Sequence, residues 1–419
     1  LVEQASAAAL RGPPPSFGGR RMRVSRRIAS VVEGGSDGWE VYYAARRRRA
    51  EGREVVNLTV GDHDVKTDAA VIDEMTASAR AGNLGYTPPM GQEPLRAAIA
   101  RRVAGRSGAA CAEGEVIVMP GGQAGLFSAM MIALDPGDAC LLITPCYATF
   151  PLTARAAGGR AVEVAADPDR GFAPDLDALD AAAAASGARA LLINSPNNPT
   201  GAVYDRASME AIAEICRARD LWLISDELYE SQVYEGAHVS PRALNGMAER
   251  TLTVGSLSKS HAMTGWRIGW LAGPEEAIAR AGDLAIATTY GVPGFIQDAA
   301  LFALGLGDAG EAEIAARYRR RRDAALDALA GARGVRAHRP AGGMYVMLDI
   351  RETGLSGTDF AMALLEETGV AVMPGESFGA AGAGHLRVAL TAPEEALVPA
   401  LRRLAAFAAA RAETPTPAA

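Results

Sequence analysis

Two lysines stand out because this chain otherwise takes its positive charges from arginine. Of the 42 lysine and arginine residues in the 419-residue sequence, only Lys66 and Lys259 are lysines. A lysine amine can lose its proton and attack a carbonyl carbon, whereas an arginine guanidinium stays charged and cannot. Lys259 is therefore a candidate nucleophile, although taken alone it could also be an ordinary surface charge.

The residues around Lys259 favour the chemical interpretation. Ser256 and Ser258 precede it, and Arg267 follows it between two glycines. Hydroxyl groups, a guanidinium fork and backbone without side chains together suit a phosphate group. A reactive lysine beside a phosphate site is typical of enzymes that bind pyridoxal 5′-phosphate (PLP).

The motif S-x-S-K-x-x-x-M-x-G-x-R-x-G at residues 256–269 resembles the PLP-lysine motif of class I/II aminotransferases of fold type I. The resemblance implies that Lys259 bonds covalently to the cofactor and that Ser256 and Arg267 hold its phosphate. Other motifs of the family extend the resemblance from about residue 25 to about residue 410.

Apolar segments alternate with helical segments in the middle of the chain, which favours a mostly parallel sheet covered by helices. With the resemblance, this predicts an α/β fold that has a large domain of this kind and a smaller α/β domain. The predicted strands of the large domain are residues 116–119, 140–144, 161–165, 190–193, 221–225 and 251–256. The expected boundaries are 1–24 for a flexible tail, 25–60 and 293–411 for the two parts of the small domain, 61–292 for the large PLP-binding domain and 412–419 for a second tail.

Further elements are expected outside the large sheet. Residues 36–51 predict a helix with Ser36 as its N-cap, and residues 55–60 predict a strand. In the small domain, we expect strands within residues 342–349, 370–373 and 386–390.

A glycine-rich turn at 121–125 follows the strand at 116–119 and precedes a helical run at 126–134. Glycines between a strand and a helix start expose backbone N–H groups to an anion. Many such turns are merely tight, but this one matches the family's phosphate loop. The resemblance makes Gly122, Gln123 and Ala124 the cradle of the cofactor phosphate.

Asp226 and Tyr229 come directly after the strand at 221–225. Ligands of open α/β sheets bind at this edge. A carboxylate opposite the pyridine nitrogen keeps that nitrogen protonated, so that the ring can accept electrons. The resemblance gives this role to Asp226 and a hydrogen bond to the ring oxygen to Tyr229. Glu227 and Glu230 have no such role in the family, and we interpret them as solvated or structural carboxylates.

Two further polar positions match family motifs. The segment N-x-P-x-N-P-T-G at 194–201 resembles the family stretch in which Asn198 bonds the ring oxygen of the cofactor, and we also expect Asn198 at the substrate. The resemblance also implies that the ring of Tyr147 stacks on the cofactor ring. The alternative for Tyr147 is a core tyrosine.

The substrate carboxylate has its own candidates. Gly61 ends the predicted strand at 55–60, where the family brings backbone close to the substrate. Arg387 lies inside an apolar strand, and a buried arginine needs an anionic partner. The alternative is an internal salt bridge. The resemblance instead implies that the fork of Arg387 grips the substrate α-carboxylate.

Tyr86 begins the segment Y-x-P-x-x-G-x-x-x-L-R, which resembles the family stretch whose tyrosine reaches the cofactor phosphate of the neighbouring subunit. The same stretch is also a proline-rich turn before a helix. The resemblance predicts a homodimer in which Tyr86 crosses the interface.

Composition excludes several classes of protein. The net charge of −7 gives no footprint for nucleic acid, and no apolar run reaches the length of a membrane span. The basic runs at 46–49 and 319–322 are interpreted as solvated helix faces.

Four cysteines without metal spacing favour free thiols in the cytoplasm and no metal site. Residues 1–27 lack the pattern of a signal peptide, so we expect a cytoplasmic enzyme.

Several longer runs, among them residues 220–227, 295–300 and 318–323, are similar to arginine–pyruvate transaminases. Gln123 also stands where several dicarboxylate-using relatives carry lysine. A basic amino donor would need an acidic contact. The candidates are Glu33, Asp37, Asp62 and Asp64, although these residues could instead cap a helix and fix a turn.

The predicted function is a PLP-dependent aminotransferase that moves an amino group from an L-amino acid to a 2-oxo acid by a ping-pong mechanism. Our best candidates are a basic donor such as arginine and pyruvate as acceptor. Aspartate, aromatic or other neutral donors remain alternatives, as does a C–S lyase of the same fold. A PLP-sensing regulator is disfavoured because residues 1–24 are too few for a DNA-binding domain.

Overall fold

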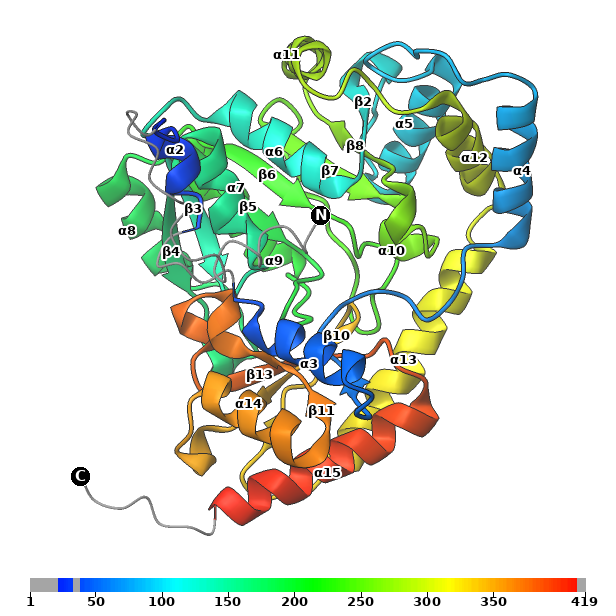
Figure 1. The fold of residues 1–419 in the computed structure, drawn as a ribbon. Helices are drawn as coiled ribbons and strands as arrows, with labels where there is room; N and C mark the ends of the chain where they lie inside the picture. The colour runs from blue at the N-terminus through cyan, green and yellow to red at the C-terminus, as the bar shows by residue number, and fades with distance from the viewer. Residues whose placement is uncertain (1–21, 33–37, 413–419) are drawn as a thin grey trace.

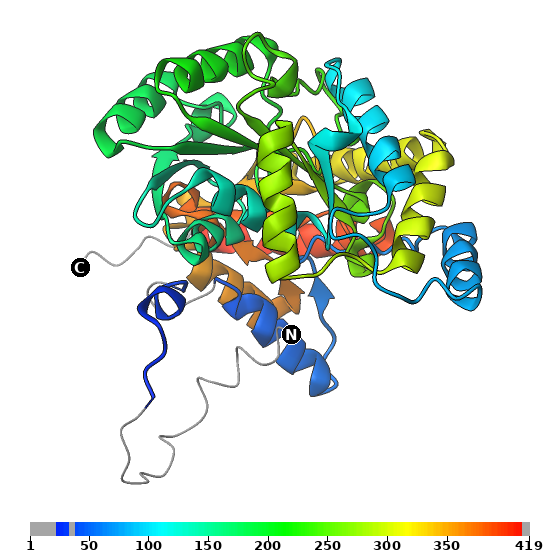
Figure 2. The same ribbon diagram turned by 90° about the horizontal axis from the view of Figure 1, so that it is seen from above.

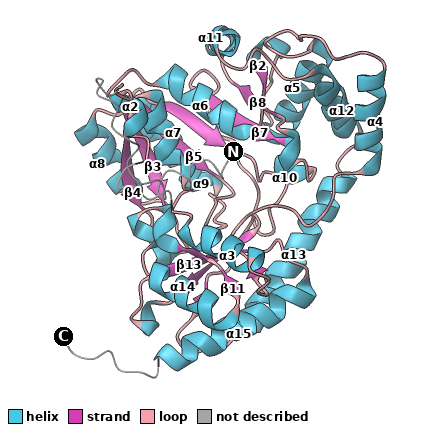
Figure 3. Cartoon of the chain, in the orientation of Figure 1, coloured by secondary structure: helices cyan, strands magenta, loops and turns pink. Residues whose placement is uncertain are grey.

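A twisted seven-stranded sheet organises the larger part of the molecule (Figures 1 and 3). The structure is a computed structural model, and it describes residues 22–32 and 38–412. The strand order is β2-β8-β7-β6-β5-β3-β4. β8 runs antiparallel to both of its neighbours, and the other strands pair in parallel. The strands are β2 (Val116–Met119), β3 (Ala139–Thr144), β4 (Arg160–Ala165), β5 (Ala190–Asn194), β6 (Trp222–Asp226), β7 (Thr251–Ser256) and β8 (Gly269–Ala272).

The predicted mostly parallel sheet is confirmed, and its six predicted strands lie within one residue of the observed bounds. β8 was not predicted as a strand. Its first residue, Gly269, is the last glycine of the lysine motif, and the short apolar run after it was not recognised as a strand.

Helices cover both faces of this sheet (Figure 2). One face packs on α6 (Gly122–Ala133), α7 (Thr149–Ala157) and α11 (Glu275–Ala287). The opposite face packs on α8 (Leu176–Ser186) and α9 (Arg206–Ala218). Near β2 and β8 it meets α4 (Ala69–Arg80), α5 (Glu93–Ser107) and α12 (Gly294–Gly305).

The sequence explains where these helices start and which side they bury. Asp175 and Asp205 accept hydrogen bonds from backbone N–H groups in the first turns of α8 and α9, which satisfies donors that a helix start leaves free. In α9, Met209, Ile212 and Cys216 are buried at a helical spacing. A single apolar stripe therefore presses α9 onto the sheet.

A four-stranded antiparallel sheet and a short parallel pair form the core of the smaller part. Their orders are β12-β13-β10-β9 and β1-β11. Helices α3, α13, α14 and α15 pack around them, as the lower half of Figure 1 shows. The elements are α3 (Glu40–Ala50), β1 (Val56–Asn57), α13 (Ala309–Leu329), β9 (Arg336–Ala337), β10 (Tyr345–Asp349), α14 (Gly357–Thr368), β11 (Val370–Ala371), β12 (Met373–Pro374), β13 (His385–Ala389) and α15 (Glu394–Ala412).

Three predicted elements differ in extent from the observed ones. The strand expected at 55–60 is β1 alone, because only Val56 and Asn57 pair with β11. The strand expected at 370–373 is split, since β11 pairs with β1 and β12 pairs with β13. Helix α3 begins at Glu40 after Trp39, and the expected N-cap Ser36 lies outside the described residues.

The expected domain boundaries remain predictions. Helix α12 begins at Gly294, just after the predicted end of the large domain, yet it packs on α4 and α5. The long helix α13 then runs from this region down to the smaller part (Figure 1). The short α2 (Arg26–Ala29) lies within the described start of the chain, and most of both predicted tails lies outside the described residues.

The interpretation of the basic runs as solvated faces is wrong for three arginines. Arg48, Arg321 and Arg322 are buried. Their guanidinium groups pair with Glu366, with Asp64 and with Glu235 respectively. These pairs supply the anionic partners that buried guanidinium groups need.

All four cysteines are free thiols. Among the described residues, no helix combines the length and the apolar character that a membrane span requires.

Candidate active site

A cavity of about 200 Å³ lies at the carboxyl ends of the parallel strands β5, β6 and β7, where it also meets the smaller part of the fold. This edge is where open α/β sheets bind ligands. Ten predicted site residues line the cavity: Gly61, Gly122, Gln123, Tyr147, Asn198, Asp226, Tyr229, Lys259, Arg267 and Arg387.

Lys259 sits on the one-turn helix α10 (Leu257–Ser260), directly after β7. Its Nζ atom donates a hydrogen bond to the backbone oxygen of Gly61 across 2.6 Å. Ser256 starts the helix, because its hydroxyl accepts a hydrogen bond from the N–H of Ser258 at 3.0 Å. The strand end and this capped turn hold the amine at the cavity.

Asp226 ends β6 and is 5% exposed. Burial raises the pKa of its carboxyl from 3.8 to about 7, while a hydrogen bond from the N–H of Leu228 and the charge of Lys259 pull it down. That hydrogen bond spans 3.2 Å. Among the described residues, no cationic group donates a hydrogen bond to this carboxyl. A cationic N–H donor in the cavity would favour its charged form.

Two tyrosines meet over the cavity. The Tyr229 hydroxyl donates to the Tyr345 hydroxyl across 3.3 Å. Burial raises the pKa of Tyr229 well above its ordinary value, and the neighbouring Tyr345 adds to this effect. Tyr229 therefore keeps its proton at neutral pH and can donate a hydrogen bond to an acceptor in the cavity.

Arg387 is 1% exposed on β13 and has no carboxylate partner among the described residues. Its Nη1 atom donates to Asn198 Oδ1 across 3.0 Å, its Nη2 atom donates to the backbone oxygen of Thr59, and its Nε atom is buried without a partner. The guanidinium lies 4.4 Å from the ring centre of Tyr345. The alternative of an internal salt bridge is thus not what the structure shows. A cation buried in this way suits an anionic ligand.

An anion-binding corner lies at the start of α6. Gly121 precedes the helix with φ of 86°, and a Cβ atom there would lie 2.1 Å from Arg267 Nη2. Only glycine therefore lets this guanidinium approach the free N–H groups of the helix start. Arg267 donates from Nη1 to the backbone oxygen of Thr264 across 2.9 Å, which fixes its position.

Three predicted phosphate residues take different positions around this corner. The Gln123 side chain turns to α7, where it donates to Thr153 and accepts from Thr149, so its contribution to an anion would come from its backbone. Ala124 and Ser256 are not among the lining residues. The Ser256 hydroxyl donates to the backbone oxygen of Ile268, whereas Ser258 does line the cavity.

Tyr86 lies away from this cavity. It is 92% exposed, and its ring centre is 5.2 Å from that of Tyr290. Its expected contact with a neighbouring subunit remains a prediction.

Of the four acidic candidates for a basic donor, Glu33 and Asp37 lie outside the described residues. Asp64 is already bound by Arg321 at 2.9 and 2.6 Å. Asp62 is exposed and accepts a hydrogen bond at 2.7 Å from the hydroxyl of Thr264, which lines the cavity. Of the two candidates that the structure describes, Asp62 is therefore the one whose carboxylate is not held by an arginine.

Glu227 and Glu230 are structural, and the solvated alternative is wrong for both. Glu227 is 5% exposed and accepts hydrogen bonds from Ser225 and Ser240. Glu230 accepts from Arg102 at 2.9 Å.

Sequence reasoning missed several lining residues. Asn194 ends β5 and donates from its side chain to the backbone oxygen of Asp226 across 3.0 Å. A polar residue at the end of a buried strand was an available signal for it. Tyr345 gave no such signal, because it belongs to an apolar strand. The other missed lining residues are Trp39, Val60, Leu126, Leu228 and Thr264.

Comparisons with known proteins agree with this geometry. The sequence model of the family "Aminotransferase class I and II" matches residues 53–404. The chain is 44% identical to arginine–pyruvate transaminase AruH of Pseudomonas aeruginosa over 391 residues, which cover 93% of this chain and 98% of that protein. It is 39% identical to an aspartate/prephenate aminotransferase of Thermus thermophilus over 389 residues, which cover 92% and 97% respectively.

Solved structures give the same result. The aspartate aminotransferase of Thermus thermophilus with maleate superimposes with a TM-score of 0.86 at 38% identity, covering 92% of this chain and 100% of that chain. The aspartate aminotransferase of Thermotoga maritima gives a TM-score of 0.85 at 32% identity, covering 92% and 99%.

The chain therefore belongs to the class I and II aminotransferase family, and it is a transaminase with the fold of that family. The resemblance inferred from the lysine motif is confirmed at the level of family, fold and reaction class.

Proposed function

We propose that this enzyme binds PLP in the cavity and transfers the amino group of a basic L-amino acid, with arginine as the best candidate, to pyruvate. The observation that carries the proposal is the convergence on one cavity of a lysine amine, a buried carboxyl and a buried guanidinium that has no carboxylate partner among the described residues. The likeness to a relative named arginine–pyruvate transaminase supports the choice of substrates.

The residues present fit PLP at both ends of the cofactor. The buried Asp226 carboxyl lacks a cationic hydrogen-bond donor among the described residues, and a pyridine N–H⁺ would supply one. Arg267 and the free N–H groups of the α6 start, brought together by Gly121, would hold the phosphate. Lys259 would supply the amine for the covalent bond.

When bound, PLP supplies an electron-accepting ring to which the electrons from the substrate Cα pass. The chain's own residues do the rest. Arg387 binds and orients the substrate α-carboxylate by its fork, with Asn198 fixing the guanidinium from one side. Asp226 would keep the cofactor nitrogen protonated by accepting a hydrogen bond from its N–H. Tyr229, which keeps its proton, would donate a hydrogen bond to an acceptor oxygen in the cavity.

The Lys259 amine, which lines the cavity, would serve as the base for the substrate Cα. Its hydrogen bond to Gly61 holds it at the side of the cavity that faces the smaller part of the fold. A neutral Lys259 amine would take the Cα proton as a general base and later give it up as a general acid. The two half-reactions then share one site in a ping-pong sequence.

A half-reaction tests this proposal. Cofactor-loaded enzyme mixed with arginine, and no 2-oxo acid, should form one equivalent of the matching 2-oxo acid per site and release no ammonia. Pyruvate added next should be converted to alanine. Release of ammonia in repeated turnover would indicate a lyase and would overturn the proposal.

The proposal includes a homodimer in which Tyr86 completes the site of its neighbour. Two observations support it: Tyr86 is 92% exposed, and it lies in an exposed patch with Tyr290 and Leu84. A hybrid of Lys259→Ala and Tyr86→Phe subunits should recover up to about half of the wild-type activity, because one of its two sites has both native residues. Absence of recovery in the hybrid would argue against a shared site.

A further inference from the structure

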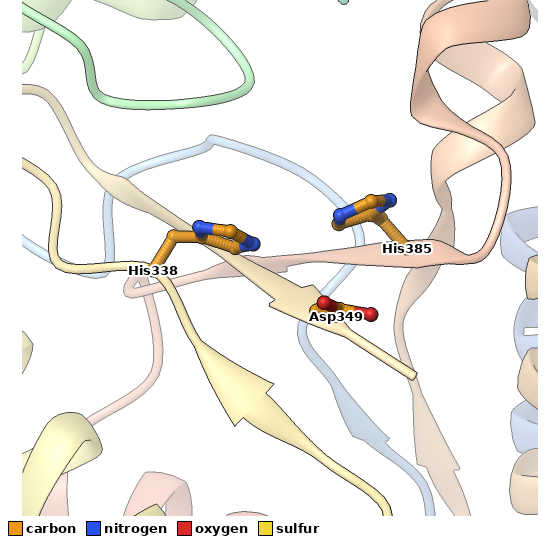
Figure 4. Close-up of side chains that lie close together, drawn as sticks. All are labelled: His338, Asp349 and His385. Carbon is orange, nitrogen blue, oxygen red and sulfur yellow. The ribbon is translucent and has the colours of Figure 1, made fainter. Parts of the chain in front are cut away.

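Two histidines and an aspartate meet on the small four-stranded sheet, apart from the cavity that holds Lys259. One ring nitrogen each of His338 and His385 and one carboxylate oxygen of Asp349 lie within 4.8 Å of one another. Asp349 and His385 face each other as partners on β10 and β13, and His338 follows β9. Figure 4 shows a nitrogen of each ring turned toward the other ring, with the Asp349 carboxylate beside the gap.

Both imidazoles leave a nitrogen without a partner. The Nε2 atoms of His338 and His385 are buried and have no hydrogen-bond partner among the described residues. His385 is 1% exposed, and its Nδ1 atom lies 2.9 Å from the backbone oxygen of Ala383. A proton on Nδ1 makes this hydrogen bond and leaves the Nε2 lone pair free. Metal-binding histidines are typically oriented by such a contact. Buried nitrogens without partners need an explanation.

The carboxylate of Asp349 can serve a third ligand position without losing all its contacts. Its Oδ1 atom accepts from the backbone N–H and the Nε of Arg351, each at 3.0 Å. Its Oδ2 atom accepts from Arg351 Nη2 at 2.7 Å and from Arg336 Nη2 at 3.0 Å. The same Arg336 Nη2 atom already bonds Asp169 at 2.9 Å. If Oδ2 turns to a cation, Arg336 and Arg351 therefore both keep Asp169 as a partner, and Arg351 also keeps its hydrogen bonds to Oδ1.

The cluster also has an entrance. Asp349, Arg336 and Arg351 line an open cavity of about 770 Å³ that continues along the C-terminal end of α13. An ion can reach the carboxylate through this cavity, which a metal site requires.

We propose that His338, His385 and Asp349 form a zinc site, with the two imidazoles bound through Nε2 and a fourth position open to water. Imidazole nitrogen and carboxylate oxygen are ordinary zinc ligands, and three protein ligands with one open position is a common arrangement. Two nitrogens at about 2.0–2.1 Å from one ion lie at most about 4.2 Å apart, so small ring rotations close the set.

A bound ion would act on the strands that carry the substrate-binding arginine. His385 and Arg387 lie two residues apart on β13, so their side chains share one face of the sheet. Asp349 on β10 and His338 after β9 complete the set. A zinc ion would thus link three neighbouring segments of the sheet beside Arg387. We expect it to raise the free energy of unfolding more than it changes the rate of transamination.

The experiment is a calorimetric titration of the cofactor-loaded enzyme with Zn²⁺, without amino acid substrates that chelate the metal. We expect one Zn²⁺ per chain and a raised Tm. His338→Asn, at the more exposed ligand, should weaken binding at least about tenfold, because even losing an outer contact of a ligand costs about that much. His385→Asn should weaken Zn²⁺ binding in the same way. Because His385 is buried, its variant could fail to fold, and in that case the result for His338→Asn tests the proposal.

Two matched controls locate the ion. His238 belongs to another group of possible ligands, with Glu227 and Glu230, and Cys111 is a partly exposed thiol. His238→Asn and Cys111→Ser should bind Zn²⁺ as the wild type does. No binding by the wild type, unchanged binding by His338→Asn, or loss of binding in either control would overturn the proposal.

Discussion

The amine of Lys259 donates a hydrogen bond to the backbone oxygen of Gly61 across 2.6 Å. Two residues earlier, the backbone oxygen of Thr59 accepts from Arg387. The short segment 59–61 therefore lies between the reactive amine and the guanidinium that we assign to the substrate carboxylate. A Cβ atom on Gly61 would lie 1.8 Å from the Tyr345 hydroxyl, so this segment passes the site only because residue 61 is glycine. The segment sets the spacing between the two functional groups.

Replacing Lys259 by alanine or by arginine should abolish transamination, because neither side chain supplies a neutral amine. General base catalysis is worth about 10²–10⁴-fold, so we expect at least that loss in single-turnover rate. The measurement is formation of 2-oxo acid from arginine by enzyme saturated with PLP. Lys66→Ala is the matched control, since Lys66 is the other lysine and is exposed. Turnover by Lys259→Arg near the wild-type rate would refute the role of the amine.

The raised pKa of Asp226 predicts that the free energy of unfolding of the cofactor-free protein depends on pH. Burial raises its pKa from 3.8 to about 7, so the folded chain holds this proton over a range in which the unfolded chain has released it. Rising pH between about 4 and 7 therefore lowers the free energy of unfolding, and the effect levels off above about 7. Below about 4 both states are protonated and the stabilisation is complete.

Urea unfolding of wild type and Asp226→Asn at pH 5, 6, 7 and 8 measures this contribution, because asparagine cannot ionise. The wild type should lose stability relative to the variant as the pH rises through this window. Parallel pH profiles would show that the carboxyl is not held neutral. With PLP bound, the difference should shrink, since a cationic ring nitrogen favours the charged carboxylate.

Arg387→Lys keeps a positive charge but loses the fork. The fork fits a carboxylate in a way that an ammonium does not. The variant should lower kcat/KM by about ten- to a hundredfold, or about 1.5–3 kcal/mol. The loss should be similar for arginine and alanine donors, because both carry the same α-carboxylate. A loss confined to one donor would instead place Arg387 at the side-chain pocket.

Most strands of the large sheet, and most of the residues that line the main cavity together with Lys259, could be predicted from the sequence. Short apolar strands are local patterns, so the strands could be predicted closely. Helix α6 instead begins at Gly122, inside the expected glycine-rich turn and four residues before the helical run expected from Leu126. Tyr345 could not, since an apolar strand gives no sign that one of its members faces a cavity. The buried pairs of Arg321 and Arg322 were also missed, because each depends on an acid that is distant in the sequence.

We expect Asp62 to influence the choice of donor. Val60 lines both the main cavity and an adjoining one that Asp62 and Asp64 line. Arg321 occupies the Asp64 carboxylate at 2.6 Å and holds the pKa of Asp64 below its ordinary value against the effect of burial. Asp62 has only its hydrogen bond from Thr264 among the contacts we find in the described chain. A basic donor side chain that passes Val60 would therefore find at Asp62 a carboxylate that no arginine holds.

We predict that arginine or another basic amino acid is a better donor to pyruvate than aspartate. Asp62→Asn should raise KM for arginine and lower its kcat/KM by about ten- to a hundredfold, the cost of about 1.5–3 kcal/mol for one charge-assisted contact. The same variant should leave alanine as good a donor as before. Asp64→Asn is the matched control: it leaves Arg321 without its acid and so should lower Tm, but it should not change the ratio of the kcat/KM values for arginine and alanine. Steady-state kinetics with both donors decides between the two acids. If aspartate or an aromatic amino acid is the best donor for the wild type, the basic-donor assignment is wrong while the transaminase remains.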